Sequence, residues 1–382
     1  MYNKAIDFSN EFISKYTNYK QNWNYEDGCV LKACIDMFKA TGDIKYADFT
    51  INYLDRCINQ DGEIINFANE VESIDSINAG KALFFAYDYT KNEKYKKALD
   101  FIYGQLMKQP RNKAGNFWHK HIYPNQVWLD GLYMSMPFYM EYETKYNKRQ
   151  NYNDIAAQFS NVHKLMFDQN KELYYHAYDE SRSEPWCNSV SGLSPNFWLR
   201  SEGWLLMSLA DTLSVMDIQI YEHYRLYEDM LKEALQGILK YADKDTGLLY
   251  QLPSLQSLPG NYTETSGNAM VAYTILKACR LKYLLSEKYL DAGKKIAQSL
   301  IDSKLLESSQ NVQRNILSEK SQGSCNLTYS LKDICMVAGL GPGNRRNGSA
   351  EYYLSEPIVS NDSKGAGPFI MMLSELLMAE NM

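Results

Sequence analysis

Residues 30–49, VLKACIDMFKATGDIKYADF, contain the pattern that decides the fold. Apolar residues recur every three or four positions as far as Ala40, which is typical of an amphipathic helix. Thr41-Gly42-Asp43 then interrupts the pattern, and a second helical pattern follows around Tyr46. A helix, a short polar break and a second helix together predict a helical hairpin.

The hairpin signature recurs along the chain in YDYTKNEKYKKALDF, YETKYNKRQNYNDIA and LKYLLSEKYLDAGKK. The copies are spaced by roughly 50 to 70 residues or multiples of that, which suits a hairpin followed by a loop. Each copy has a tyrosine near the start of its second helix: Tyr46, Tyr95, Tyr152 and Tyr289, with a further copy around Tyr227. About twelve helices are predicted, over residues 3–18, 26–41, 44–59, 75–89, 93–108, 125–144, 150–167, 198–216, 222–242, 265–282, 286–301 and 366–380.

Twelve antiparallel helices in six hairpins can close into an all-α (α/α)6 barrel, and an open helical solenoid is the competing architecture. Long loops rich in aromatic and polar residues favour the closed barrel, because binding sites are built from long loops at one end of a rigid scaffold. These loops are expected at residues 60–74, 110–124, 170–197, 244–264 and 303–364, with short strands in LYYHAYDE and GLLYQLP. No Pro/Gly/Ser-rich linker divides the 382 residues, so we expect a single catalytic domain over 1–382.

The composition excludes several classes of partner. The net charge is −6 and no basic block occurs, which argues against nucleic acid. The seven cysteines lack metal or redox spacing and are expected to be buried free thiols. The N-terminal stretch MYNKAIDFSNEFISKY is charged throughout, and no later stretch is apolar enough to span a membrane. We therefore expect a cytoplasmic protein, monomeric or weakly homo-oligomeric, without metal or cofactor.

Chemistry-bearing residues are densest in residues 117–138, FWHKHIYPNQVWLDGLYMSMPF. Pro124-Asn125 predicts a helix start near residue 125, with Gln126, Asp130 and Met134 on one face. An aspartate in so apolar a helix is costly to bury unless it is paired or protonated. Burial favours the protonated form, which is the form a proton donor needs. A structural aspartate bonded to a neighbouring loop is an equally good interpretation of this helix alone.

Tryptophans alternate with cations in several other segments. Aromatic faces stack on sugar rings and Arg or Lys binds carboxylates, so the combination predicts a sugar-acid ligand. The residues concerned are His119 and Lys120, Trp128, His176 in YYHAYDE, and Trp198, Arg200 and Trp204 in NFWLRSEGW.

Two further positions have a structural and a functional interpretation. Asp75, in SIDSINAGKAL, is either a helix N-cap or an acidic group of the site. Trp23 and Tyr25, in WNYEDG, form either a sugar platform or ordinary loop packing. The segment CMVAGLGPGNRRNGSAEYYLSEP fits no nucleotide fingerprint and is predicted to be an ordered loop across the barrel mouth.

Several of these motifs together resemble family 105 of the glycoside hydrolases, the unsaturated rhamnogalacturonyl hydrolases. The motifs are QVWLDGLYM with the preceding HK, YYHAYDE, FWLRSEGW, GNYTETSGNAM, AGLG with GSAEYY, and EPIVSNDSKGAGPF. They run in order from about Trp23 to Phe369 and imply an (α/α)6 barrel. By motif, Asp130 corresponds to the catalytic aspartate and Asp75 to a second acidic position. The remaining sugar-acid pocket is implied at Trp23, Tyr25, His119, Lys120, Trp128, His176, Trp198, Arg200 and Trp204. Arg345 and Arg346 match loosely, and no contacts are assigned to them.

The resemblance also implies the chemistry. The substrate would be a short pectin-type oligosaccharide with a terminal 4,5-unsaturated uronic acid, and Asp130 would protonate C4 and then deprotonate the water that adds at C5. The alternatives are another (α/α)6 sugar enzyme or a helical-repeat binding scaffold. Such an enzyme would be an unsaturated glucuronyl hydrolase on another polysaccharide, an epimerase, or a two-carboxylate exo-glycosidase. The two-carboxylate plan needs a second acid such as Glu202 or Glu264.

Overall fold

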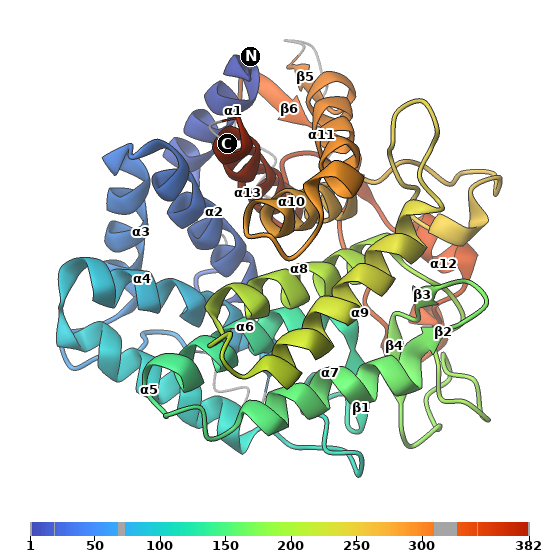
Figure 1. Cartoon of the computed structure of the whole chain (residues 1–382), viewed down its shortest axis with the longest axis horizontal. Coiled ribbons are helices and arrows are strands. Elements are labelled where there is room, and N and C mark those ends of the chain that lie inside the picture. Colours follow the sequence, from blue (N-terminus) through green and yellow to red (C-terminus); the bar gives the residue numbers. More distant parts are fainter. Residues whose placement is uncertain (1, 19, 68–72, 309–326, 342, 381–382) are drawn as a thin grey trace.

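The helices form two concentric rings (Figure 1). The computed structural model describes residues 2–18, 20–67, 73–308, 327–341 and 343–380. The inner ring consists, in order, of α2 (Tyr25–Thr41), α4 (Lys81–Thr90), α6 (Leu129–Lys145), α8 (Leu199–Val215), α10 (Thr265–Arg280) and α13 (Ser363–Ala379). The outer ring consists of α1 (Asn3–Lys15), α3 (Ile44–Cys57), α5 (Glu93–Lys108), α7 (Tyr152–Met166), α9 (Tyr221–Leu239) and α11 (Ser286–Ser303). The predicted (α/α)6 barrel is confirmed.

The sequence of each helix explains its ring. The inner helix α10 buries every residue from Thr265 to Cys279, so it needs a surface that is apolar or internally bonded all round. The outer helix α11 buries a single stripe, made of Tyr289, Gly293, Ile296, Ala297, Leu300 and Ile301. The ring closes where α13, the last inner helix, packs against α2, the first (Figure 1).

Two predicted helix starts are wrong. The helix expected from residue 125 begins at Leu129, because Asn125 has a left-handed φ of 64° and Gln126–Trp128 form strand β1. Strand β1 pairs with β4 (Ala177–Asp179), so Gln126 does not share a helical face with Asp130.

The second wrong start concerns Asp75. The helix expected there is a 3-10 helix, η1 (Ile74–Gly80), followed directly by α4. Ser73 occupies the N-cap position of η1, and Asp75 lies inside the first turn. The helix-cap interpretation of Asp75 is therefore wrong.

The loops at the active end contain more structure than expected. The predicted strand in LYYHAYDE is present as β3 (Leu173–Tyr174) and β4, and β3 pairs with β2 (Phe167–Asp168). The additional pairs are β5 (Leu305–Glu307) with β6 (Tyr329–Leu331), and β7 (Ile334–Cys335) with β8 (Ile358–Val359). Short helices η2 (Pro253–Leu255), η3 (Asn344–Arg346) and α12 (Ala350–Ser355) were not predicted. The strand expected in GLLYQLP is reduced to one bridge between Tyr250 and Thr263. Of the loops predicted at 60–74 and 303–364, residues 68–72, 309–326 and 342 lie outside the described residues.

A second apolar cluster, separate from the barrel core, holds these loops together. It contains Trp128, Trp186, Trp198, Leu252, Leu340 and Tyr353, among others. Loop side chains that pack this way are fixed in position, which a binding site requires.

Six of the cysteines fall in the described residues, and all six are free thiols; Cys325 falls outside them. Within the same part of the chain, every helix is too short or too polar to cross a bilayer.

Candidate active site

A cavity opens at the end of the barrel where the inner helices begin. It encloses about 580 Å³ including its open mouth, within the range of about 300–1,000 Å³ that small-molecule sites occupy. Its walls come from the first turns of α2, α6, α8 and α13 and from the loops at 119–123 and 337–346. The lining residues are Tyr25, Asp75, His119, Lys120, Tyr123, Trp128, Asp130, Met134, Trp198, Arg200, Trp204, Val337, Ala338, Gly339, Arg346 and Lys364.

Asp130 lies in the first turn of α6 and faces His176. Its Oδ2 atom is 3.3 Å from Nε2 of His176, without hydrogen-bond geometry, and both atoms are buried without a protein hydrogen-bond partner. The other ring nitrogen of His176, Nδ1, is 2.8 Å from the hydroxyl of Tyr353. Since buried polar groups are normally hydrogen-bonded, these two atoms are available to a ligand or to water.

The pairing of β1 with β4 brings these two groups together. Trp128 is opposite Ala177 in the ladder, and the backbone N–H of Leu129 donates to the carbonyl of His176 at 3.1 Å. Asp130 follows that hydrogen bond directly. The ladder thus fixes a helix start relative to a loop residue that is distant in sequence.

Asp75 lies between the side chains of Lys120 and His119. Its Oδ2 lies 2.7 Å from Nζ of Lys120, and its Oδ1 lies 3.5 Å from Nε2 of His119. Burial raises the pKa of Asp75, but the charge of Lys120, followed by that of His119, outweighs burial and leaves the pKa lowered. Burial lowers the pKa of His119 to about 4. His119 is therefore neutral at pH 7, and Lys120 is the cation that balances Asp75.

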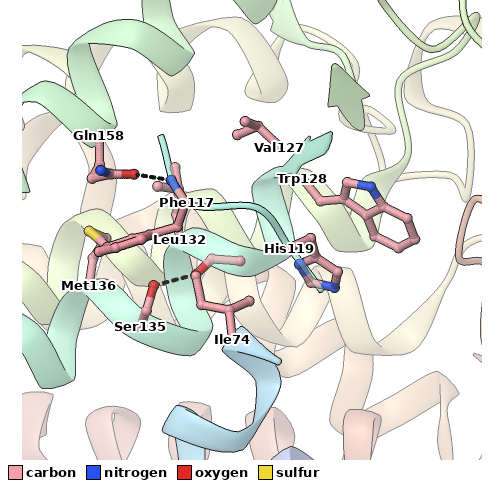
Figure 2. A pocket seen from close by; sticks show the side chains of 10 residues that line it. Ile74, Phe117, His119, Val127, Trp128, Leu132, Ser135, Met136 and Gln158 are labelled. Atoms are coloured by element: carbon pink, nitrogen blue, oxygen red, sulfur yellow. Dashed lines mark hydrogen bonds between the residues drawn. The ribbon is translucent and has the colours of Figure 1, made fainter. Parts of the chain in front are cut away.

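His119, Tyr123 and Trp128 form an aromatic wall. The rings of His119 and Trp128 are stacked with nearly parallel planes, at 6° and 4.5 Å between centroids, and Tyr123 stacks on Trp128 at 5.1 Å. Figure 2 shows the imidazole next to the indole, with Ile74 and Leu132 lining a small apolar pocket beside them. Flat aromatic faces of this kind suit the apolar face of a sugar ring.

Arg200 is not free in the structure. Its Nε donates to Oγ of Ser266 at 2.7 Å, its Nη2 lies 3.4 Å from Oε1 of Glu264, and Nη2 also donates to the carbonyl of Cys335. It is 1% exposed. Arg200 lines the cavity as predicted, but its charge is offset by Glu264, and its role towards a ligand carboxylate stays a prediction.

Trp198 and Trp204 lie at the start of α8, on either side of Arg200. Trp198 packs against His176 at 4.8 Å between ring centroids, and Trp204 stacks on Tyr133 at 4.8 Å. Both line the cavity. The FWLRSEGW motif thus supplies aromatic surface on the wall and on the floor.

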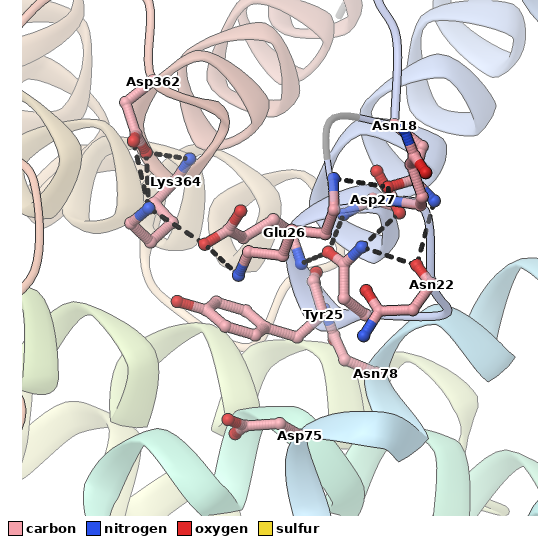
Figure 3. Close-up of polar contacts among 12 residues, drawn as sticks. Asn18, Asn22, Tyr25, Glu26, Asp27, Asp75, Asn78, Asp362 and Lys364 are labelled. Atoms are coloured by element: carbon pink, nitrogen blue, oxygen red, sulfur yellow. Dashed lines mark hydrogen bonds and ion pairs between the residues drawn. The ribbon is translucent and has the colours of Figure 1, made fainter. Parts of the chain in front are cut away.

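Figure 3 shows the polar contacts at the junction of α2 and α13. The amino group of Lys364 lies 3.1 Å from Glu26 and 2.9 Å from Asp362. Tyr25 lies beside them and lines the cavity. Trp23 does not line it: its indole donates to the carbonyl of Ser76 at 2.8 Å and supports η1 from behind.

The structure brings most of the predicted site residues to one cavity. Asp75, Asp130, Tyr25, His119, Lys120, Trp128, Trp198, Arg200 and Trp204 all line it. His176 joins them through Asp130, while Trp23 lies outside. Sequence reasoning missed Tyr123, Val337, Ala338, Gly339, Arg346 and Lys364. The sequence did predict that the glycine-rich loop containing Gly339 and Arg346 crosses the barrel mouth. That prediction did not indicate which residues of the loop face the cavity.

Glu202 and Glu264, the two acids suggested as the second carboxylate of a paired-carboxylate mechanism, are engaged elsewhere. Glu202 accepts a hydrogen bond from the backbone N–H of Tyr174 at 2.6 Å, and burial raises its pKa to about 8. Glu264 caps α10 by accepting from the N–H of Gly267 at 2.7 Å. Neither lines the cavity.

Comparison with known proteins identifies the family of the chain. The sequence profile of Glycosyl Hydrolase Family 88 matches residues 3–380. The structure of a family 105 glycoside hydrolase from C. acetobutylicum ATCC 824 is 38% identical, covers 99% of both chains and superposes with a TM-score of 0.89. The unsaturated rhamnogalacturonyl hydrolase YesR of Bacillus subtilis is 23% identical over 276 residues, which is 71% of this chain and 75% of YesR.

A more distant structure shares the fold. The unsaturated glucuronyl hydrolase from Bacillus sp. GL1 is 16% identical, covers 99% of this chain and 97% of its own, and superposes with a TM-score of 0.63. Because a family profile spans almost the whole chain and a family 105 structure matches along its full length, this chain is a glycoside hydrolase that belongs to the group of families 88 and 105.

Proposed function

We propose that this glycoside hydrolase removes the terminal 4,5-unsaturated uronic acid from short pectin-type (rhamnogalacturonan) oligosaccharides, with Asp130 as general acid and base. The observation that carries the proposal is the environment of Asp130. It lines the cavity, no Lys or Arg of the described residues forms an ion pair with it, and its Oδ2 faces His176 at 3.3 Å. The name of the distant relative YesR supports the substrate class.

The proposed reaction begins at the double bond. Asp130 donates its proton to C4, and positive charge develops at C5 and the ring oxygen. Water adds at C5 while the Asp130 carboxylate takes a proton from it, so the carboxyl group is regenerated. The resulting hemiketal rearranges and releases the neighbouring sugar. One carboxyl group is enough for this sequence, in agreement with Glu202 and Glu264 lying outside the cavity.

Asp75 has a separate part in the proposal. Its carboxylate is neutralised by Lys120 at 2.7 Å, so it exerts little like-charge repulsion on Asp130. We assign it to positioning: its oxygens hold Lys120 and accept hydrogen bonds from water or a substrate hydroxyl. His176 orients the Asp130 carboxyl through the 3.3 Å contact.

The proposal is tested with a panel of lyase-generated unsaturated disaccharides. Turnover destroys the conjugated double bond, so its ultraviolet absorbance disappears. We expect activity on the uronate–rhamnose disaccharide. Galacturonate and glucuronate become identical after elimination at C4. The disaccharides of the panel therefore differ in their second sugar, and that sugar identifies the natural substrate. Turnover only of glucosamine-linked or glucose-linked disaccharides would move the assignment to an unsaturated glucuronyl hydrolase, and no turnover of any disaccharide would overturn it.

Asp130→Asn tests the catalytic assignment. General acid–base catalysis contributes about 10²- to 10⁴-fold, so we expect kcat to fall by at least that range while the melting temperature and substrate binding are kept. The matched control is Asp61→Asn, which changes an exposed loop carboxyl outside the cavity. An Asp130→Asn enzyme with wild-type kcat would exclude Asp130 as the acid.

The cytoplasmic location and the monomeric or weakly oligomeric state stay predictions from the sequence. A cytoplasmic enzyme of this kind would act on short unsaturated products after lyases have cut the polymer outside the cell.

A further inference from the structure

Four cationic side chains line the cavity, and their partners differ. They are Lys120, Arg200, Arg346 and Lys364. A cation whose charge no protein carboxylate offsets attracts an incoming ligand carboxylate more strongly than a cation that is already paired. The pairing of the four therefore shows where an anionic ligand is recognised.

Three of the four are paired. Lys120 lies 2.7 Å from Asp75, and Arg200 lies 3.4 Å from Glu264. Lys364 contacts both Glu26 and Asp362, but Lys20 also pairs with Glu26, at 3.0 Å, so two cations meet two carboxylates there. In each of these pairs the positive charge is matched by a carboxylate, and the paired side chains are buried or half-buried.

After this pairing, one acid and one cation of the cavity are left over. Asp130 has no Lys or Arg partner, and Arg346 forms no ion pair with a carboxylate of the described residues. Among the cavity residues that the structure describes, Arg346 is therefore the cation whose charge no protein carboxylate offsets.

The backbone next to Arg346 contains two glycines, so no side chain from these positions separates the Arg346 side chain from the cavity. Arg346 lies at the end of η3 and extends along the backbone of residues 339–341, which has glycine at both ends. A Cβ atom on Gly339 would lie 3.7 Å from Nη1 of Arg346 and 3.5 Å from the ring of Trp128. The guanidinium therefore ends near the aromatic wall, with no side chain from residue 339 between them. Tyr352 holds this backbone by donating to the carbonyl of Gly339 at 2.5 Å.

We propose that Arg346 binds the carboxylate of the unsaturated uronate and is the specificity-determining cation of the site. The inference rests on the proposed function, because the uronate carboxylate is the anion that every substrate of that class contains. A guanidinium presents two parallel N–H donors to the two carboxylate oxygens, and this fixes the ring orientation as well as its charge. Held by this group and by the stacking wall, the sugar presents its double bond to the site in one orientation.

The test compares two substrates with three enzymes. The substrates are the unsaturated disaccharide as free acid and as its methyl ester, which removes the anion and keeps the double bond. The enzymes are the wild type, Arg346→Gln and the matched control Arg345→Gln, whose arginine is exposed and outside the cavity. Esterification also changes the reactivity of the double bond itself, but this effect is the same for all three enzymes. It therefore cancels when their acid-to-ester ratios of kcat/KM are compared with one another.

We expect Arg346→Gln to lose about 10- to 100-fold in kcat/KM on the acid, mostly through KM, because a charge-assisted bidentate contact is removed. Its activity on the ester should stay near that of the wild type, which also shows that the variant is folded. Arg346→Lys should recover part of the preference for the acid, and Arg345→Gln should keep all of it.

One result would overturn the inference: an Arg346→Gln enzyme that keeps the wild-type acid-to-ester ratio, whether its activity is unchanged or falls equally on both substrates. A wild-type enzyme inactive on both substrates would instead refute the proposed function, and the assignment of Arg346 to a uronate would be withdrawn with it.

Discussion

Two aspartates face one cavity with different partners. Asp75 is bound to Lys120, which together with His119 lowers its pKa against the effect of burial. Asp130 faces His176 and forms no ion pair with a Lys or Arg in the part of the chain that the structure describes. Side chains of the same type take different roles when their environments differ in this way. Sequence alone named both residues but could not separate them, because their partners come from other loops.

His119 gives a prediction about pH and stability. Burial lowers its pKa to about 4, whereas an unfolded histidine has a pKa near ~6.5. The unfolded chain therefore binds the proton first, so the stability contribution of neutral His119 is fully present above pH ~6.5 and is lost as pH falls towards 4. Between pH 7 and 5 this group should remove about 2 kcal/mol from the free energy of unfolding.

His119→Gln isolates that contribution. Urea unfolding of both proteins at pH 7 and at pH 5 gives the difference in pH dependence, which is independent of the stacking lost in the variant at both pH values. We expect the variant to lose about 2 kcal/mol less than the wild type on acidification. Equal losses would show that His119 is protonated in the folded protein.

At the scale of the elements, Glu264 joins three segments beneath the cavity residue Arg200. One of its oxygens accepts from Ser266 at 2.6 Å and from the N–H of Cys335 at 3.0 Å, and also pairs with Arg200. The other accepts from the N–H of Gly267. The starts of α8 and α10 and the strand β7 thus share one buried carboxylate.

Glu264→Gln should be strongly destabilising. The glutamine side chain would place its N–H donors against the donors that now bind the Glu264 carboxylate. It would also leave the buried guanidinium of Arg200 without a counter-charge. Breaking a buried ion pair by removing one partner costs about 3–5 kcal/mol, measured here by urea unfolding. The control is Glu287→Gln on the exposed side of α11, which should change stability by less than ~0.5 kcal/mol. A loss of similar size in both variants would contradict this role of Glu264.

The elements themselves were largely predictable, because apolar periodicity is a local property. The failures occurred where long-range pairing overrides it. Residues 126–128 become a strand because residues 177–179 are available as a partner, and nothing near residue 126 indicates that. The same limit applies to the site. Glu26 and Lys364 are 338 positions apart, so no spacing rule could join them. The ion pair between Arg200 and Glu264 could not be predicted from the sequence for the same reason.

At the scale of the molecule, charge is buried at two depths of the barrel. One set lines the cavity, and a second set lies further along the same inner helices. In the second set Lys277 pairs with Asp211 at 2.6 Å, Lys32 pairs with Asp36, and Lys81 donates to the carbonyl of Tyr133 at 3.1 Å. Burial lowers the pKa of Lys81 to about 7, although Asp211 opposes this.

Lys81→Met tests whether this second set carries a stability cost. An unfolded lysine has a pKa near ~10.4, so below pH 7 the folded state bears the full penalty of a buried charge, and the penalty disappears as pH rises towards 10.4. The variant should therefore be more stable than the wild type at pH 6, by about 1–4 kcal/mol, and the difference should shrink by pH 9. Thermal unfolding measures it, with exposed Lys288→Met as control. A variant that is less stable at pH 6 would show that the lysine charge is net favourable.

The closure of the ring by α13 against α2 has a consequence for how the protein is made. The ribosome synthesises the chain from the N-terminus, so α2 leaves the exit tunnel first among the inner helices and α13 leaves it last. Until α13 emerges, Glu26 lacks Lys364, and one wall of the cavity is absent. A nascent chain therefore cannot hold an oligosaccharide, and binding competence arrives with the final helix rather than growing hairpin by hairpin during translation.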